Sequence, residues 1–281
     1  MIALLLSAED AVSFYVDSEV KAVRQKGTAE SPFRTLERAV AAAYRQAYRR
    51  GSSENGADPI PVSIFIRSDV YVEEAVFLTV PITIYGVNNP TVTFGENAGF
   101  VVDHTVLEIN DCALNRSERI TEPRTVPLLY GAPQSRILLK GVSVTAKEGG
   151  DAVILRESRL LCTDTVFTSA QSAQAVLIRA AKSVISAAGS TFSAKGLMAL
   201  CFDLTGTQCN LTQTSCILSP RYTGRAAELT DSELKAADFR CSYTSPLFDS
   251  IDAAVIVDAA SAIDLQDPLE FTGFLQPVVR R

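Results

Sequence analysis

Turn-forming residues recur at nearly regular intervals over most of this chain. Each stands between two short stretches of alternating apolar residues, and the longest step runs from Asp111 to Gly141. A period of roughly 25 residues is typical of repeat proteins, in which each unit buries its apolar face only by stacking on its neighbours. The recurring residues are Gly86, Asp111, Gly141, Asp164, Gly189, Thr214 and Asp238.

The stretches between these turns have the pattern of strands. Apolar residues alternate with polar ones, as at Leu107 and Ile109 before Asp111, so inward positions recur with period two within a unit. Units without crossover helices favour an all-β coil of parallel strands, with roughly seven to nine rungs about 4.8 Å apart. Glycine and aspartate suit the corners because they tolerate left-handed backbone angles, so we expect a turn role for Asp111 and Asp164.

The chain is predicted to form a single domain, 1–281, with distinct ends. Residues 14–61 are expected to supply a first strand and an amphipathic capping helix, in which Ser31 is the N-cap and Pro32 the first helical residue. Residues 62–245 would form the rungs, and residues 246–281, where the period is lost, a C-terminal cap. The apolar face of the helix would contain Leu36, Ala39, Val40, Ala43 and Ala47.

Three irregularities interrupt the period. A charged segment at 115–124 lacks apolar alternation and is predicted to leave the coil as a loop, as is the shorter segment 219–225. Cys209 comes one residue earlier than the period requires, which a β-bulge could absorb. Because insertions in repeat proteins often lie on a binding face, the sequence predicts a ligand-binding loop containing Asn115, Arg116, Glu118, Arg119, Glu122 and Arg124.

Composition excludes some classes of function. The net charge of −6 offers no general basic field for nucleic acid, and no apolar run approaches the roughly 20 residues that cross a bilayer. The apolar segment 2–6 is open to two interpretations: a first strand, or the end of a shortened secretory signal. The six cysteines contain no CxxC pair and fit buried apolar positions best, although a disulfide stays open.

The N-terminal third resembles a known family. Tyr15-Val16-Asp17, Gly27-Thr28, the step from Pro32 to Leu36 and the alanine-rich 39–43 resemble the opening of bacterial pectin-lyase-like right-handed parallel β-helix proteins. The resemblance covers about residues 14–94 and implies a right-handed β-helix. It implies little about function, because this fold is shared by lyases, hydrolases, esterases, adhesins and spikes.

Catalytic sets known from this fold are only partly matched. The segments Asp69–Glu73 and Gln174–Arg179 resemble two segments of its carbohydrate esterases, but the aspartate-bearing segments of those enzymes are missing. His104 stands alone, and its side chain is expected to point away from that of Asp103, as neighbours in a strand do. We expect Tyr71 to pack in a turn beside the solvated Glu73 and Glu74.

No catalytic residue, cofactor site or metal site is therefore assigned from the sequence. The favoured hypothesis is a non-enzymatic binding or scaffold protein, with a polysaccharide or an envelope protein as partner. Its expected location is the periplasm, cell surface or exterior, or otherwise the cytoplasm. The alternative is a carbohydrate-active enzyme of the same fold: a lyase, hydrolase or esterase. The alternative predicts two or more carboxylates from neighbouring rungs in one groove with an aromatic platform, although the chain has no Trp and only 8 Tyr.

Overall fold

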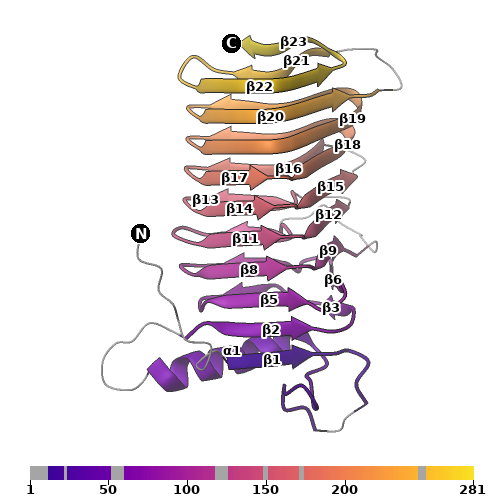
Figure 1. The fold of residues 1–281 in the computed structure, drawn as a ribbon, viewed down its shortest axis with the longest axis vertical. Coiled ribbons are helices and arrows are strands. Elements are labelled where there is room, and N and C mark those ends of the chain that lie inside the picture. The colour runs from indigo at the N-terminus through magenta and orange to yellow at the C-terminus, as the bar shows by residue number, and fades with distance from the viewer. Residues whose placement is uncertain are drawn as a thin grey trace.

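The chain folds into a right-handed coil of parallel strands. The computed structural model describes residues 12–21, 24–51, 60–117, 126–147, 151–170, 174–245 and 251–281. Each coil places its strands in register on those of the coil before, so that long parallel sheets run along the molecule (Figure 1). The predicted all-β, right-handed parallel β-helix is confirmed. No helix among these residues is long and apolar enough to span a membrane.

The first sheet forms one side of the coil. Each coil contributes one strand to this sheet. Along each strand, the side chains point alternately into the interior and toward the solvent. The members are β1 (Val12–Val16), β2 (Val62–Ile66), β5 (Ile82–Gly86), β8 (Val106–Asn110), β11 (Arg136–Lys140), β14 (Arg159–Thr163), β17 (Val184–Ala188) and the first parts of β19 (Gln208–Thr230), β20 (Glu233–Tyr243) and β22 (Ala262–Thr272).

The second and third sheets complete each coil. The second contains β3 (Val70–Val72), β6 (Thr91–Phe94), β9 (Ala113–Arg116), β12 (Ser143–Lys147), β15 (Val166–Ala170), the start of β18 (Thr191–Thr205) and the middle or second parts of β19, β20 and β22. The third contains β4 (Val76–Leu78), β7 (Phe100–Val102), β10 (Leu129–Gly131), β13 (Val153–Arg156), β16 (Gln174–Ala181), the ends of β18 and β19, β21 (Ile251–Val257) and β23 (Phe274–Arg280).

Two corners of the coil are built alike. From His104 to Asp238, one residue per coil has a left-handed backbone, with φ near +50° to +60°, at corner A, between the third and first sheets, and at corner B, between the first and second. The predicted turn role of Asp111, Gly141, Asp164, Gly189 and Asp238 at corner B is thus confirmed. The members of corner A are His104, Gln134, Glu157, Lys182, Gly206 and Asp231.

The number of residues between corners A and B is constant from His104 to Asp238. In each of these coils, the left-handed residue of corner B comes seven positions after the left-handed residue of corner A. The first such pair is His104 and Asp111, and the last is Asp231 and Asp238. The left-handed residue that follows Gly206 is Gln213, so the expected mark at Thr214 is off by one residue. Between His104 and Asp238, variation in coil length therefore falls beyond corner B, in the second and third sheets and the corner that joins them, here called corner C. In the following coil, corner B itself is longer, because the register of β20 with β22 shifts between Ala237 and Phe239.

The slip at Cys209 has the same origin. Strand β17 pairs with β19 in unbroken register, with Ile185 opposite Cys209, so the expected bulge is absent from this pair. The register instead shifts at corner C, between Gly196 and Met198. The predicted loop at 219–225 is also wrong, because these residues run within β19 from the second sheet into the third.

A ladder of hydroxyl groups follows corner A inside the coil. The backbone N–H of Ser158 donates to Oγ of Ser183 at 3.2 Å, Ser183 N–H to Oγ1 of Thr207 at 3.3 Å, and Thr207 N–H to Oγ of Ser232 at 3.0 Å. All four side chains are buried. Each hydroxyl thus satisfies a backbone donor that a tight corner would leave unpaired between two coils.

The interior of the coil is filled by stacked apolar side chains. Phe167 and Phe192 are fully buried, occupy the same position in successive coils, and have nearly parallel rings. The six cysteines are free thiols and buried. Burial raises the pKa of the Cys112 thiol to about 12, so these side chains act as small apolar groups, as the sequence predicted.

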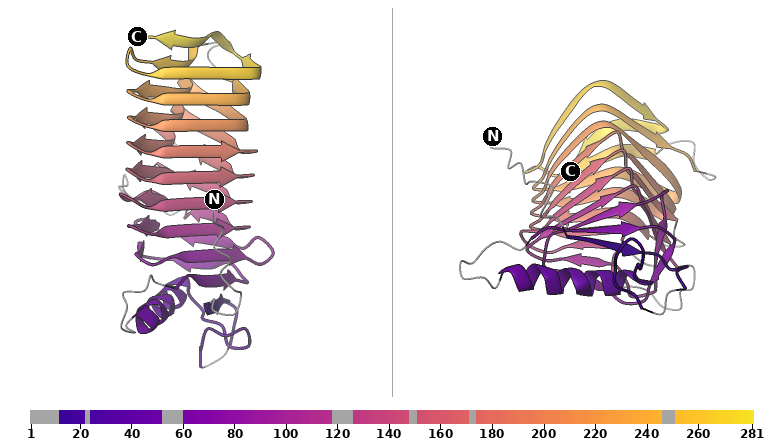
Figure 2. Two further views of the ribbon diagram at one scale, coloured as in Figure 1. Left: turned by 60° about the vertical axis from the view of Figure 1, so that its left-hand side comes forward. Right: turned by 60° about the horizontal axis from the view of Figure 1, so that its bottom comes forward.

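The helix α1 (Leu36–Gly51) lies across the N-terminal end of the coil (Figures 1 and 2). Its apolar residues Leu36, Ala39 and Ala43 are buried in the same core as the strands. The expected N-cap is wrong. Thr35 takes this position, with its hydroxyl accepting from Arg38 N–H at 3.4 Å, whereas the Ser31 hydroxyl donates to the carbonyl of Arg24.

The C-terminal segment differs from the expected irregular cap. Strands β21, β22 and β23 stack in parallel on β19, β20 and β21, so residues 251–281 continue the coil after the period has become hard to see in the sequence. These strands also form the C-terminal end of the described coil (Figure 1).

Candidate functional site

The outer face of the third sheet carries a continuous row of side chains. In register along the coil axis lie Phe77, Val101, Tyr130 and Ile154, and the row continues with Arg179, Asp203 and Glu228. Phe77 is exposed, and Val101, Tyr130 and Ile154 are half-buried. An apolar and aromatic surface thus leads directly to a group of charged residues.

Arg179 holds two carboxylates from its two neighbouring coils. Its Nε lies 2.9 Å from Oδ2 of Asp151, and its Nη1 lies 3.1 Å from Oδ2 of Asp203. Arg179 and Asp203 pair across β16 and β18, while Asp151 stands just before β13 in the coil below. We call Asp151, Arg179 and Asp203 the charged cluster.

The three groups of the charged cluster differ in their access to solvent. The Asp151 side chain is 18% exposed, that of Asp203 31% and that of Arg179 47%. Burial raises the pKa of Asp151 above its usual range, and the charge of Asp203 adds to this effect, although the hydrogen bond and charge of Arg179 oppose it. Burial works against the Arg179 charge, but the two aspartates raise its pKa overall.

A hollow adjoins the charged cluster. Glu228, the neighbour of Asp203 in the row, forms an ion pair with Arg225 at 2.6 Å. This pair lies at one side of a hollow of about 200 Å³ at corner C. It is lined by Met198, Ala199, Leu200, Thr223, Gly224, Arg225 and Glu228.

The predicted binding segment leaves the coil at the same corner. Its described part is the end of β9, where Asn115 is half-buried and pairs in register with Thr93 and Thr145. The chain returns at Val126, shortly before Tyr130 of the row. Glu118, Arg119, Glu122 and Arg124 lie outside the described residues, and a ligand-binding role for this segment stays a prediction.

Arg116 has a structural role that the sequence did not indicate. It is 4% exposed, and its guanidinium donates to the carbonyls of Gly95 at 2.9 Å, Ala98 at 2.5 Å and Val126 at 2.7 Å. These carbonyls belong to the corner C turns of two coils. The buried charge therefore fixes the backbone on either side of the predicted segment.

The expectation for His104 and Asp103 is wrong. Nδ1 of His104 lies 2.6 Å from Oδ1 of Asp103, so the two side chains meet rather than point apart. Strand β7 ends at Val102, and His104 has φ +53°, so the alternation of a strand no longer applies. The pair is exposed at corner A, which agrees with the expected surface or turn role of His104.

The segment with Tyr71 lies on another face. Tyr71 is half exposed, rather than packed as expected, whereas Glu73 and Glu74 are solvated as predicted. The three residues line a hollow of about 400 Å³ with Thr35 and Glu37 at the start of α1. The segment belongs to β3 in the second sheet, so it contributes nothing to the charged cluster.

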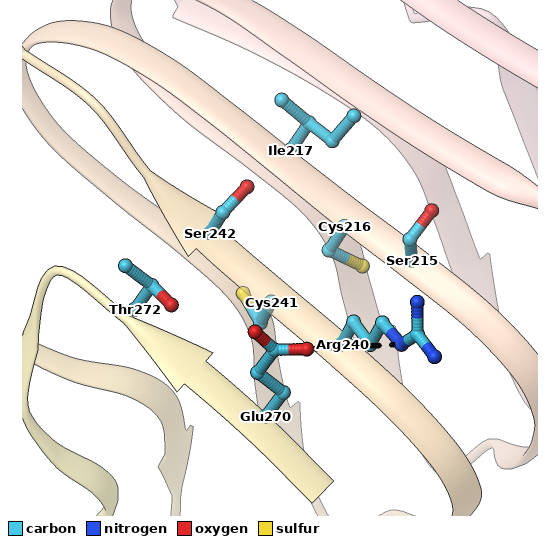
Figure 3. Close-up of a pocket in the computed structure, with 8 residues that line it drawn as sticks. All are labelled: Ser215, Cys216, Ile217, Arg240, Cys241, Ser242, Glu270 and Thr272. Atoms are coloured by element: carbon cyan, nitrogen blue, oxygen red, sulfur yellow. Dashed lines mark ion pairs between the residues drawn. The ribbon is translucent and has the colours of Figure 1, made fainter.

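A third hollow, of about 230 Å³, lies on the outer face of the second sheet near the C-terminal end (Figure 3). Arg240 and Glu270 face each other there at 3.8 Å, and both side chains are 68% exposed. Ser215, Ser242 and Thr272 add hydroxyl groups. An ion pair so open to solvent is weak, and the hollow lacks the shielded carboxyl found at the charged cluster.

Sequence reasoning missed Asp151 and Asp203, and it assigned no role to Arg179, although Arg179 ends the segment Gln174–Arg179 that resembles a segment of the esterases. Arg179 and Asp203 are separated in the sequence by one coil, and both stand at outward strand positions. That spacing is the signal by which they could be found. Asp151 gives no such signal, since its separation from Arg179 is longer than one regular coil and it directly follows corner C.

The strand register and the repeated corners define a right-handed parallel β-helix. No protein-family model matches the sequence, and no curated protein matches it. Among solved structures, a pectin methylesterase in complex with a hexasaccharide has a TM-score of 0.48 and 10% identity, over 83% of this chain and 80% of that one. Escherichia coli YbhC has a TM-score of 0.47 and 12% identity, over 99% and 87%.

Proposed function

We propose that this protein is a carbohydrate-active enzyme that hydrolyses ester groups on a polysaccharide at the charged cluster. The observation that supports the proposal is that Arg179 binds carboxylates from both neighbouring coils on one outer face. A single guanidinium spans both, so the two carboxylates lie no more than about 8 Å apart. Two carboxylates close together on one outer face are the part of the enzyme hypothesis that this arrangement supports.

The two aspartates differ in their access to solvent, which suits the different roles of a general acid and a nucleophile. The raised pKa of Asp151 favours its protonated form, which suits a general acid for the departing alkoxide. Asp203 is more exposed, and the guanidinium of Arg179 at 3.1 Å holds its carboxylate at the surface, where it can attack a carbonyl carbon. We assign Asp203 as nucleophile and Asp151 as general acid.

Arg179 favours ester hydrolysis over the other reactions considered. Attack on an ester places negative charge on the carbonyl oxygen, which a neighbouring guanidinium stabilises. Glycosidic cleavage develops positive charge on the sugar, which the same group opposes. A lyase needs a base to remove a proton, whereas the pKa of Arg179 is raised and the residue stays protonated.

The test is release of methanol or acetate from methyl-esterified and acetylated polysaccharides by the purified full chain. Asp203→Ala should abolish turnover, and Asp151→Asn should lower kcat by roughly 10²-fold or more. Asp103→Asn, an exposed carboxylate at corner A, is the matched control and should leave turnover unchanged. A folded wild-type protein that releases neither product from any of these polymers overturns the proposal.

A non-enzymatic binding or scaffold protein is the second candidate. It is favoured by the pairing of both aspartates with Arg179, because a paired carboxylate is partly neutralised and the cluster also fits a structural role. Binding of a polysaccharide without turnover, lost in Arg179→Met, would support it. For either function we propose that the protein acts in the periplasm, at the cell surface or outside the cell, where such polymers occur.

A further inference from the structure

We propose that three aromatic residues at the N-terminal end of the third sheet hold the polysaccharide at a distance from the site where its ester groups are hydrolysed. They are Tyr44 and Tyr48 of α1 and Phe77 of β4, and we call them the aromatic anchor. The ligand is a single polysaccharide chain that runs along the coil axis from the anchor to the charged cluster. The inference rests on the proposed function, since it concerns the substrate of the same site.

The aromatic anchor presents ring surface to solvent. Phe77 is 64% exposed and Tyr48 is 61% exposed, more than any other aromatic side chain in the part of the chain that the structure describes. Exposed rings offer flat apolar faces on which the C–H groups of a sugar can stack, and a tyrosine adds a hydroxyl for the polar edge of the sugar. The anchor therefore has the chemistry of a sugar-binding surface.

Hydrogen bonds fix the aromatic anchor in place. The hydroxyl of Tyr44 donates to the carbonyl oxygen of Phe77 at 2.7 Å and accepts from the backbone N–H of Thr79 at 2.7 Å. The ring of Tyr48 stacks on that of Tyr44, with 6.3 Å between the centroids and 14° between the planes. Because helix and strand are joined here, a ligand has less conformational freedom to remove when it binds.

A row of uncharged side chains connects the aromatic anchor with the charged cluster. In successive coils, the outward residues in register are Phe77, Val101, Tyr130, Ile154 and Arg179. These are four steps of about 4.8 Å, so the row from Phe77 to Arg179 is roughly 19 Å long. It is straight and one side chain wide, which fits one extended polymer chain better than the broad patch that a protein partner needs.

Two contacts on the same polymer chain would strengthen its binding. A chain held at the anchor keeps its ester groups close to Asp203 and Arg179 at a high effective concentration. The anchor contacts the substrate equally before and during the reaction, so it lowers KM rather than raising kcat. A short ester cannot reach from the charged cluster to the anchor. We therefore expect a preference for long chains that is expressed in KM.

Kinetics on the polymer that the full chain hydrolyses test the aromatic anchor. Tyr48→Ala and Phe77→Ala should each raise KM at least fivefold, whereas Asp151→Asn should act on kcat. Phe77→Tyr keeps a ring at this position and should recover most of the affinity that Phe77→Ala loses. The matched control is Tyr71→Ala on the second sheet, where the ring is 51% exposed, and it should keep the wild-type KM.

Chain length provides a second comparison. Counted per ester group, the wild type should have a KM at least tenfold lower for the polymer than for an acetylated or methyl-esterified disaccharide. The double variant Tyr48→Ala/Phe77→Ala should lose this preference. Both side chains are exposed, so the double variant should fold normally, and circular dichroism checks that it keeps the strand content of the wild type.

Binding without turnover separates the aromatic anchor from the proposed function. In native gels that contain methyl-esterified polygalacturonate or acetylated xylan, the polymer should retard the wild type but not the double variant. If retardation depends on the anchor but the wild type releases no ester product, the proposed function is wrong and the anchor stands.

The opposite results overturn the anchor. Ester release with the same KM in wild type and double variant would do so while the proposed function stands. A wild type that neither gel retards would also overturn the anchor. The same holds for a wild-type dimer in sedimentation that the double variant abolishes, because the aromatic surface would then bind a second copy of the chain.

Discussion

The rings of Phe167 and Phe192 lie 5.0 Å apart and within 5° of parallel, one coil above the other. Both side chains are fully buried, and they belong to strands β15 and β18, which pair in register. The apolar columns of the coil thus depend on contacts between residues that are a whole coil apart in the sequence. Each buried side chain packs against the side chain at the same position in the next coil.

Phe167→Asp should destroy cooperative folding, because the charge would be buried in this column without a partner. Val166→Asp is the matched control, since Val166 is the neighbouring residue of β15 but points outward and is 45% exposed. Thermal unfolding followed by circular dichroism should show a sharp transition for the control alone. A melting curve of Phe167→Asp that matches the wild type would contradict the interior register.

Arg116→Met should lower the free energy of unfolding by more than about 2 kcal/mol, because it leaves several carbonyls of corner C without a donor. Arg116→Lys should recover only part of the loss, since a lysine cannot reach these carbonyls with a planar fork. Urea unfolding gives the comparison with Arg136→Met, an exposed arginine of β11. Equal effects at the two positions would contradict the structural role of Arg116.

Ser183→Ala should cost about 1–2 kcal/mol, because the backbone N–H of Ser158 then has no acceptor across the coils. Ser186→Ala, on the outward side of β17, should change the free energy of unfolding by less than about 0.5 kcal/mol. Hydrogen exchange should also become faster at the Ser158 amide in Ser183→Ala. A Ser183→Ala variant as stable as Ser186→Ala would contradict the hydroxyl ladder.

The raised pKa of Asp151 predicts a pH dependence of stability with a definite sign. Because the folded protein binds this proton more tightly than the unfolded chain does, the contribution of Asp151 to stability falls as pH rises. The fall begins near the ordinary aspartate pKa of about 3.9 and ends above the raised folded pKa. Urea unfolding of wild type and Asp151→Asn across this window should show the wild type losing stability relative to the variant. A wild type that instead gains stability relative to the variant as pH rises would contradict the direction of the shift.

The coil could be predicted because its physical requirements repeat. Apolar residues at alternate positions and small or polar residues at corner B recur with the period of one coil, and this pattern correctly predicts that Leu107 and Ile109 point into the interior. Even the hydroxyl ladder was visible in principle, since Ser or Thr follows every left-handed residue of corner A.

The charged cluster could not be predicted in the same way. Its residues meet through side chains from three coils, and Asp151 follows a corner of variable length, so its register depends on the fold. The role of Arg116 at corner C could not be predicted either, because its carbonyl partners Gly95 and Val126 lie on opposite sides of a charged segment in the sequence. Contacts of this kind form at insertions that interrupt a coil. The repeat in the sequence predicts only the regular parts of each coil.

The constant number of residues between corners A and B from His104 to Asp238 gives this part of the molecule a regular spacing that could be used as a scaffold. Since the coils from His104 to Asp238 differ in length only beyond corner B, peptides grafted at corner C of these successive coils would emerge along one edge at steps of about 4.8 Å. The hydroxyl ladder and the first sheet would be untouched by such grafts. The chain thus offers a rigid display surface on which the spacing between copies of an epitope is set by counting coils.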